Sequence, residues 1–178
     1  MKRRRFLRWG LFGAGTLAVA GMGLQLWPTT RRHRPSPGRA LAVLDEREFA
    51  ILAAAAARIV TAPSADPVAI AERVDDSLAM QPLEAQADFK KLLGTLESAL
   101  VGLMLDGRPH PFTHLSPDDQ DAALFAFRDS RILLRRTGYQ ALRKLCVAAH
   151  YSDEKSWADV GYPGPPEFIL PKDYQVPQ

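Results

Sequence analysis

The spacing of apolar residues predicts helices through the middle of the chain. Asp45 and Glu48 lie three positions apart, as in a capping box, and predict a helix that continues to Val60. Asp66 followed by Pro67 combines an N-cap residue with proline at the first helical position, and predicts a second helix. The positions expected to be buried in that second helix are Val68, Ala71, Val74 and Leu78, and those expected to face solvent are Arg73, Asp75 and Asp76.

Two longer helices are expected after these. One is predicted from about Leu83 to Leu105. Its expected buried stripe consists of Phe89, Leu92, Leu93, Leu96, Leu100, Leu103 and Met104. The other starts at Ser116-Pro117, a capping serine followed by a first-turn proline, and reaches His150 either continuously or with a break at Thr137-Gly138.

The 117–150 segment has apolar residues on two sides, which is usual for the central helix of a bundle. The two stripes are Leu124, Phe127, Leu134, Ala141 and Leu145, and Phe125, Ile132, Tyr139, Leu142 and Cys146. The proline-rich residues 162–178 have no helical period and predict an extended arm. We therefore expect an all-α fold: a small helical bundle (residues 40–161) with an extended C-terminal arm (residues 162–178), preceded by an N-terminal signal or anchor helix and a basic, Pro-rich linker (residues 1–39).

The N-terminal residues have the order of a twin-arginine export signal. Arg3 and Arg4 are followed, after one position, by Phe6 and Leu7, and an uncharged, glycine-diluted run then extends from Trp9 to Trp27. Such signals are addresses that a receptor recognises, and they direct folded proteins across the bacterial inner membrane. An ordinary secretory signal or a membrane anchor would also begin with positive charge, but the weak apolar run and the arginines after it favour the twin-arginine translocase.

Cleavage of this leader is left open by the sequence. Ala18-Val19-Ala20 has the small-x-small pattern of a signal peptidase site. If the leader is kept, the run from Trp9 to Trp27 would span roughly 28 Å as a helix, enough for a hydrocarbon core of about 30 Å. Both outcomes predict a periplasmic protein, and the second predicts attachment to the inner membrane.

The charge of the chain is divided between the leader and the rest. Residues 1–39 contain nine Lys or Arg and no acid, whereas residues 40–178 contain fourteen Lys or Arg against twenty Asp or Glu, a net charge of −6. Nucleic-acid binding requires a basic surface on the folded part. The sequence therefore argues against a nucleic-acid partner.

Few residues suggest chemistry. With Cys146 as the only cysteine, the chain can form neither an internal disulfide nor a c-type haem or iron–sulfur site. His110 and His114 have the i, i+4 spacing of zinc ligands, but the prolines beside His110 prevent a regular helix, so a simple loop pair is favoured. Cys146 and His150 are also i, i+4, yet a cysteine on an apolar stripe is usually a core residue. We expect no cofactor in this chain.

Two groups of charges have simple interpretations. Asp75 and Asp76 point to different sides of a helix and are expected to form a solvated face. Arg128, Arg131 and Arg135 align at helical spacing. They are either a solvated face paired locally with Asp121 and Asp129, or a docking strip for an acidic partner.

The segment from Trp157 to Pro166 combines an aromatic pair, two glycines and three prolines. Its motif is Trp157-x-x-x-Gly161-Tyr162-x-Gly164-Pro165, and it occurs together with the export signal, Leu44-x-x-x-Glu48-x-x-x-Leu52, Leu115-Ser-Pro-Asp-Asp-Gln120, Phe127-Arg-Asp-Ser-Arg131 and His150-Tyr151. With these motifs in this order, the chain resembles the gluconate 2-dehydrogenase subunit 3 family. The resemblance covers most of residues 41–166, and the loop at 62–66 is shorter than expected for the family.

The resemblance implies an accessory function. Such small subunits are not catalytic; they accompany a large FAD-containing subunit of the glucose–methanol–choline type, and often a multihaem cytochrome c subunit. The large subunit commonly lacks a signal, and the small one carries it through the twin-arginine pathway. The residues expected to contact the partner are Arg128, Arg131, Tyr139, Tyr151, Trp157, Gly161, Tyr162, Gly164 and Pro165.

Two other classes remain open. The chain could be a stand-alone anchored scaffold that recruits a different periplasmic protein. It could also be an enzyme that uses the His110/His114 loop or the Cys146–His150 pair.

Overall fold

The computed structural model describes residues 35–164, and within this range the regular structure is entirely helical. The first three helices are α2 (Glu46–Ile59), α3 (Pro67–Ala79) and α4 (Leu83–Glu97), followed by α5 (Ala99–Asp106). A short 3-10 helix, η1 (Phe112–His114), leads to α6 (Pro117–Arg128), α7 (Leu133–Tyr151) and the 3-10 helix η2 (Glu154–Val160). The all-α prediction is confirmed for the described residues. The leader, and the arm beyond Gly164, lie outside them.

Three of the predicted helix starts, those of α2, α3 and α6, are correct because local side-chain caps determine them. The Asp45 side chain accepts a hydrogen bond from the Glu48 N–H, and the Glu48 carboxylate accepts one from the Asp45 N–H, which completes the capping box. Asp66 caps α3 ahead of Pro67. Ser116 caps α6 through the Asp119 N–H.

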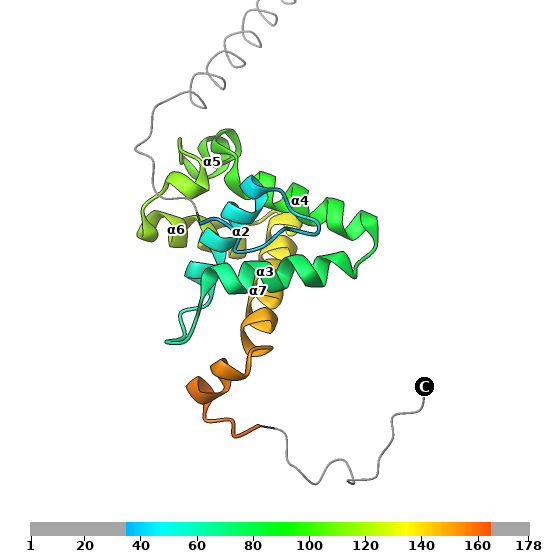
Figure 1. Ribbon diagram of the computed structural model, residues 1–178. Helices are drawn as coiled ribbons and strands as arrows, with labels where there is room; N and C mark the ends of the chain where they lie inside the picture. Colours follow the sequence, from blue (N-terminus) through cyan, green and yellow to red (C-terminus); the bar gives the residue numbers. More distant parts are fainter. Residues whose placement is uncertain (1–34, 165–178) are drawn as a thin grey trace, which may run out of the picture.

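The central helix of the bundle is α2, which packs against α3, α4, α6 and α7 (Figure 1). Its buried residues are nearly consecutive: Phe49, Ala50, Ile51, Leu52, Ala53, Ala55 and Ala56. Alanine keeps α2 narrow, and a helix that is apolar all round can be enclosed by its neighbours. The prediction that the 117–150 segment is central was therefore wrong, since α2 has that position.

The predicted 83–105 helix is two helices. Ser98 has an extended backbone, with φ −63° and ψ 113°, and its Oγ accepts a hydrogen bond from the Val101 N–H. Because this cap starts α5 in a new direction, the predicted stripe is divided. Phe89, Leu93 and Leu96 are buried, whereas three residues predicted to be buried are exposed: Leu100, Leu103 and Met104.

The 117–150 segment also breaks, but at Asp129–Ile132 instead of Thr137-Gly138. The Ser130 hydroxyl accepts from the Ile132 N–H, a local side-chain bond that competes with the helix. Gly138 instead lies inside α7 and allows a close approach, because a Cβ there would lie 2.5 Å from the Leu92 Cδ1 atom.

The apolar stripes of the 117–150 segment are not continuous surfaces. Of the second stripe, Leu142 and Cys146 are buried in the core, whereas Phe125 and Ile132 are exposed. Of the first stripe, Leu134 on the outer side of α7 is exposed.

Asp75 was predicted to face solvent and is instead completely buried. Its Oδ1 atom accepts hydrogen bonds from the Val43 and Leu44 N–H groups, at 3.0 and 2.8 Å, and its Oδ2 atom accepts one from the Ala42 N–H at 2.6 Å. The carboxylate therefore holds the segment before α2 against α3. The neighbouring Asp76 is exposed and pairs with Arg39, as a solvated-face residue does.

Candidate functional site

The residues predicted to contact a partner lie in separate places. The group at the C-terminal end of α7 and in η2 comprises Tyr151, Trp157, Gly161, Tyr162 and Gly164. Arg128 and Arg131 lie before the first turn of α7, and Tyr139 is half-buried in its middle, packed against the core. Because the 19 residues of α7 span roughly 28 Å, the two outer groups are at opposite ends of that helix. Arg3, Arg4, Phe6, Leu7 and Pro165 lie outside the described residues.

The C-terminal group is ordered around Trp157. Its indole N–H donates a hydrogen bond to the Tyr151 carbonyl at 3.1 Å, and its ring meets that of Tyr162 edge-on, with centroids 5.2 Å apart. Gly161, with φ +66°, ends η2 in the left-handed conformation that favours glycine. At Gly164, with φ +105°, a Cβ would come within 3.4 Å of the Trp157 ring. The chain thus folds back over the indole, which explains the two glycines of the motif.

Polar contacts hold this segment against the bundle. Asp153 caps η2 and binds Arg73 of α3, and the pKa of Asp153 is lowered by the Lys155 backbone N–H and by Arg73. The Asp159 carboxylate accepts hydrogen bonds from the Ser64 N–H and hydroxyl, in the loop between α2 and α3. The segment is therefore fixed from both ends of η2 without entering the apolar core.

The aromatic residues of the segment remain accessible. Tyr151, Val160 and Tyr162 are exposed, and Trp157 is half-buried outside the main core. Ordered aromatic side chains of this kind give a large contact area for little loss of conformational entropy, and they are enriched at protein interfaces. We name residues 151–164 the aromatic segment.

The predicted arginine alignment is wrong, because α6 ends at Arg128 and the break rotates the residues that follow. Arg128 makes a bidentate ion pair with Asp129, and its guanidinium lies 4.5 Å from the Phe125 ring centroid. Hydrogen bonding within the pair raises the pKa of Arg128 and lowers that of Asp129. Local pairing is therefore confirmed for Asp129. The other predicted partner, Asp121, binds Arg58 of α2 instead.

Arg135 belongs to a buried charged cluster that the sequence did not predict. Its guanidinium binds the Asp106 carboxylate, with distances of 3.1 and 2.6 Å, and stacks 4.2 Å from the Phe127 ring centroid. Arg108 is also buried, and its Nη2 atom lies 3.9 Å from Asp106. The Asp106-Gly107-Arg108 turn follows the predicted end of the helix at Leu105, and the signal available there was a pair of charged residues next to an apolar helix.

Cys146 and His150 do not form a reactive couple. Cys146 is fully buried, and burial raises the pKa of its thiol to about 12, so the thiol stays protonated at neutral pH. His150 is buried, with Nε2 lying 3.8 Å from the Asp159 carboxylate. No group of three or more His, Cys, Asp or Glu side chains that could hold a metal occurs within residues 35–164.

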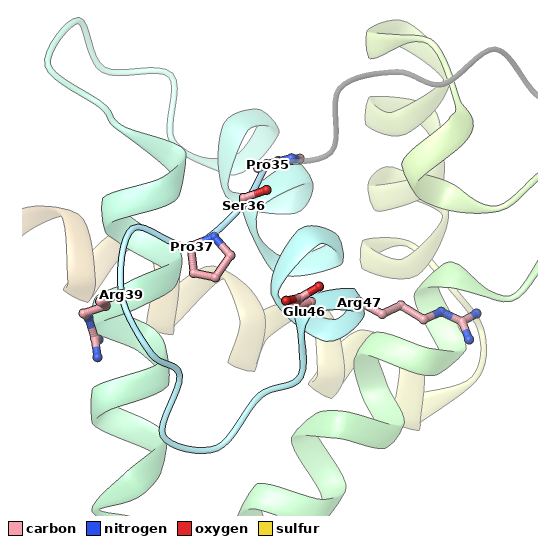
Figure 2. Close-up of a pocket in the computed structure, with 6 residues that line it drawn as sticks. All are labelled: Pro35, Ser36, Pro37, Arg39, Glu46 and Arg47. Atoms are coloured by element: carbon pink, nitrogen blue, oxygen red, sulfur yellow. The ribbon is translucent and has the colours of Figure 1, made fainter.

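A shallow pocket lies where the segment before α2 passes over the start of that helix. Its lining residues are Pro35, Ser36, Pro37, Arg39, Glu46 and Arg47. Figure 2 shows Arg39 and Arg47 on opposite sides of the pocket, pointing away from one another. Arg39 is held by α3 through Asp76 and the Glu72 carbonyl. Because its polar groups do not converge, the pocket lacks the usual arrangement of a small-molecule site.

The aromatic segment is the best-formed candidate site, and it lies within the region shared with a known family. The family model described as Gluconate 2-dehydrogenase subunit 3 matches residues 46–164, more than half of the chain. No curated protein and no solved structure matches the chain. None of the helices in the described range is long and apolar enough to cross a membrane.

Proposed function

The chain belongs to the gluconate 2-dehydrogenase subunit 3 family, and from this premise we propose that it is the non-catalytic small subunit of a periplasmic dehydrogenase complex. Its partner is a large, FAD-containing subunit of the glucose–methanol–choline type that oxidises a sugar or an alcohol. Complexes of this kind can also include a multihaem cytochrome c subunit. FAD and haem belong to those partners.

The observation that carries this proposal is the aromatic segment. It lies inside the family match, is held by side-chain contacts to α3 and to the loop after α2, and presents Tyr151 and Tyr162 to solvent. A segment that is fixed but not buried provides a preformed contact surface, which lowers the entropic cost of binding. Docking of the large subunit on this segment is therefore the central element of the proposal.

The core supports a non-catalytic role. A nucleophilic cysteine requires a thiolate, which forms when a positive neighbour lowers the thiol pKa. Burial raises the pKa of the Cys146 thiol instead, and the side chain lies in the main apolar cluster. Cys146 is thus suited to packing between helices.

The predicted N-terminal signal is the basis for a role in export. With Arg3, Arg4, Phe6 and Leu7 as the address for the twin-arginine translocase, the chain would bring a folded, cofactor-loaded large subunit to the periplasmic side of the inner membrane. The large subunit must then bind before export. Its contact with the aromatic segment would therefore form in the cytoplasm, where it would also support folding and stability of the large subunit. A retained leader would also attach the complex to the membrane.

Co-expression with the large subunit tests the proposal. The double variant Trp157→Ala and Tyr162→Ala should release the large subunit while the helical circular dichroism spectrum is unchanged, because neither side chain is part of the main core. The matched control is Met80→Ala with Leu83→Ala, which removes two exposed apolar side chains at the α3–α4 turn. Full binding by the Trp157/Tyr162 variant would refute docking on the aromatic segment. A wild-type chain that binds no flavoprotein would favour the scaffold alternative.

Turnover measurements separate the small subunit from an enzyme. The purified chain should be inert, and the large subunit alone should keep its catalytic rate with a soluble electron acceptor. Turnover that depended on His110, His114 or the Cys146–His150 pair would contradict the non-catalytic role.

A further inference from the structure

The short helix α5 exposes an apolar stripe that nothing in residues 35–164 covers. Leu100, Leu103 and Met104 have i, i+3, i+4 spacing, and are 47%, 42% and 76% exposed; Leu105 beside them is 50% exposed. Neighbours at this spacing lie on one side of a helix. In Figure 1, α5 lies at the end of the molecule opposite η2, far from the aromatic segment. The stripe is therefore a separate surface.

The start of α7, next to the end of α5, also exposes apolar side chains. Ile132, Leu133 and Leu134 are 46%, 65% and 79% exposed. The Asp106–Arg135 ion pair links the end of α5 to the first turn of α7, with closest atoms 2.6 Å apart. A standard protein interface covers about 800 Å² on each partner, a disc roughly 32 Å across, which is wide enough to include both elements. We name residues 100–105 and 132–134 together the α5 surface.

The charges next to the α5 surface are mainly positive. Residues 128–136 include four arginines and one aspartate, although residues 40–178 as a whole carry a net charge of −6. Arg108 and Arg135 share the single carboxylate of Asp106. Four of their buried nitrogens, Arg108 Nε, Nη1 and Nη2 and Arg135 Nε, find no hydrogen-bond acceptor among the described residues. Burial also lowers the pKa of Arg108, because the charged form is poorly solvated there.

We propose that the α5 surface is a second docking site for the large dehydrogenase subunit, and that the partner presents an apolar patch bordered by carboxylates. This inference rests on the proposed function. Apolar contact would come from the two leucine-rich stretches, and the partner's carboxylates would face the exposed Arg128 and Arg131 and the half-buried Arg136. Together with the aromatic segment, the α5 surface would let the small subunit hold its partner at both ends of α7.

The fixed geometry of Arg128 and Arg136 favours a protein partner over lipid headgroups. Arg128 is held by Asp129, and Arg136 by the Ser130 carbonyl at 2.6 Å. Anchored guanidinium groups suit carboxylates at set positions on another protein. Binding to an anionic lipid surface, in contrast, relies on long, mobile cationic side chains around an apolar helix face.

Paired charge substitutions on the full chain test this inference. Met104→Glu with Leu134→Glu places two negative charges on the α5 surface, at side chains 76% and 79% exposed. Met80→Glu with Leu83→Glu is a matched control, since the residue types are the same and the side chains are 84% and 79% exposed. Affinity for the purified large subunit should fall by about tenfold or more in the first variant, because charges at an apolar contact remain unpaired. It should change little in the control.

A single variant tests the electrostatic part. Arg131 is exposed and forms no ion pair or hydrogen bond with another described residue. Arg131→Glu should slow association and reduce its dependence on salt, whereas Arg47→Glu, at another exposed arginine, should not. Equal association rates for the two variants would overturn the predicted carboxylate border.

Each remaining outcome has a definite meaning. If wild-type chain and large subunit do not bind at all, the proposed function fails. If they bind, and Met104→Glu/Leu134→Glu binds like the control, only the second docking site is refuted. If the Met104→Glu/Leu134→Glu variant still binds the large subunit but no longer binds anionic phospholipid vesicles that wild type binds, the α5 surface is a membrane-binding surface instead. If the wild-type chain is a dimer and the Met104→Glu/Leu134→Glu variant is a monomer, the α5 surface is a contact between copies of the chain.

Discussion

Replacing the buried Asp75 should lower the free energy of unfolding strongly. Its buried carboxylate accepts three backbone hydrogen bonds from Ala42, Val43 and Leu44, which are 31 to 33 positions away in the sequence. Replacing it with alanine leaves those N–H groups without an acceptor. The segment before α2 would then lose its attachment to α3.

The magnitude follows from the exposure of the three donors. Hydrogen bonds to a charged group contribute about 1.5–3 kcal/mol each when they are buried. Only Leu44 is buried, whereas Ala42 is exposed and Val43 half-buried, so water can replace part of the loss at those two. We expect Asp75→Ala to lower the free energy of unfolding by roughly 3–4 kcal/mol, a large part of the 5–15 kcal/mol typical of a domain. Asp75→Asn keeps one acceptor oxygen and should cost roughly half as much.

The adjacent residue provides the control. Asp76 is exposed and pairs with Arg39, and a surface ion pair contributes about 0–1 kcal/mol, so Asp76→Asn should be nearly neutral. The assay is urea unfolding of the purified full chain, followed by circular dichroism. Equal midpoints for Asp75→Ala and Asp76→Asn would refute the assigned role of the buried carboxylate.

Three further predictions concern other parts of the chain. The Cys146 thiol, with its pKa raised to about 12 by burial, should react with iodoacetamide only after unfolding, and rapid labelling of the native chain would contradict its position in the core. Hydrogen bonding to Arg58 lowers the pKa of Asp121 below 3.8, so this pair stabilises the fold above that value and its contribution is lost as the pH falls toward the lowered pKa. The stability difference between wild type and Asp121→Asn should accordingly shrink between about pH 5 and pH 2, and a constant difference would refute the pairing. Arg3→Lys with Arg4→Lys should keep both this chain and the large subunit in the cytoplasm, whereas Arg31→Lys with Arg32→Lys should not; normal export of the first variant, measured by cell fractionation, would exclude the twin-arginine pathway.

Features set by neighbouring residues were predictable from the sequence. Asp45, Asp66 and Ser116 start helices because their side chains bind backbone groups two or three positions ahead. The glycines of the aromatic segment have the positive φ angles expected of a sharp turn. Family membership could be inferred because such motifs occur together in a fixed order.

Features set by distant residues were not predictable. In a helical pattern Asp75 is simply a polar position, and nothing near it in the sequence shows that its partners precede α2. Ser98 is compatible with both a helix interior and a cap, and the choice of a cap exposes the α5 stripe. A break at Gly138 was left open because the sequence does not show that Leu92 packs against this glycine.

The most direct test of the central claim is to purify this chain by affinity from its native membranes and to record the absorption spectrum of what elutes. Membership of a dehydrogenase complex predicts flavin bands together with a larger co-eluting chain, and haem bands where a cytochrome subunit is present. A colourless chain that elutes alone would contradict the account.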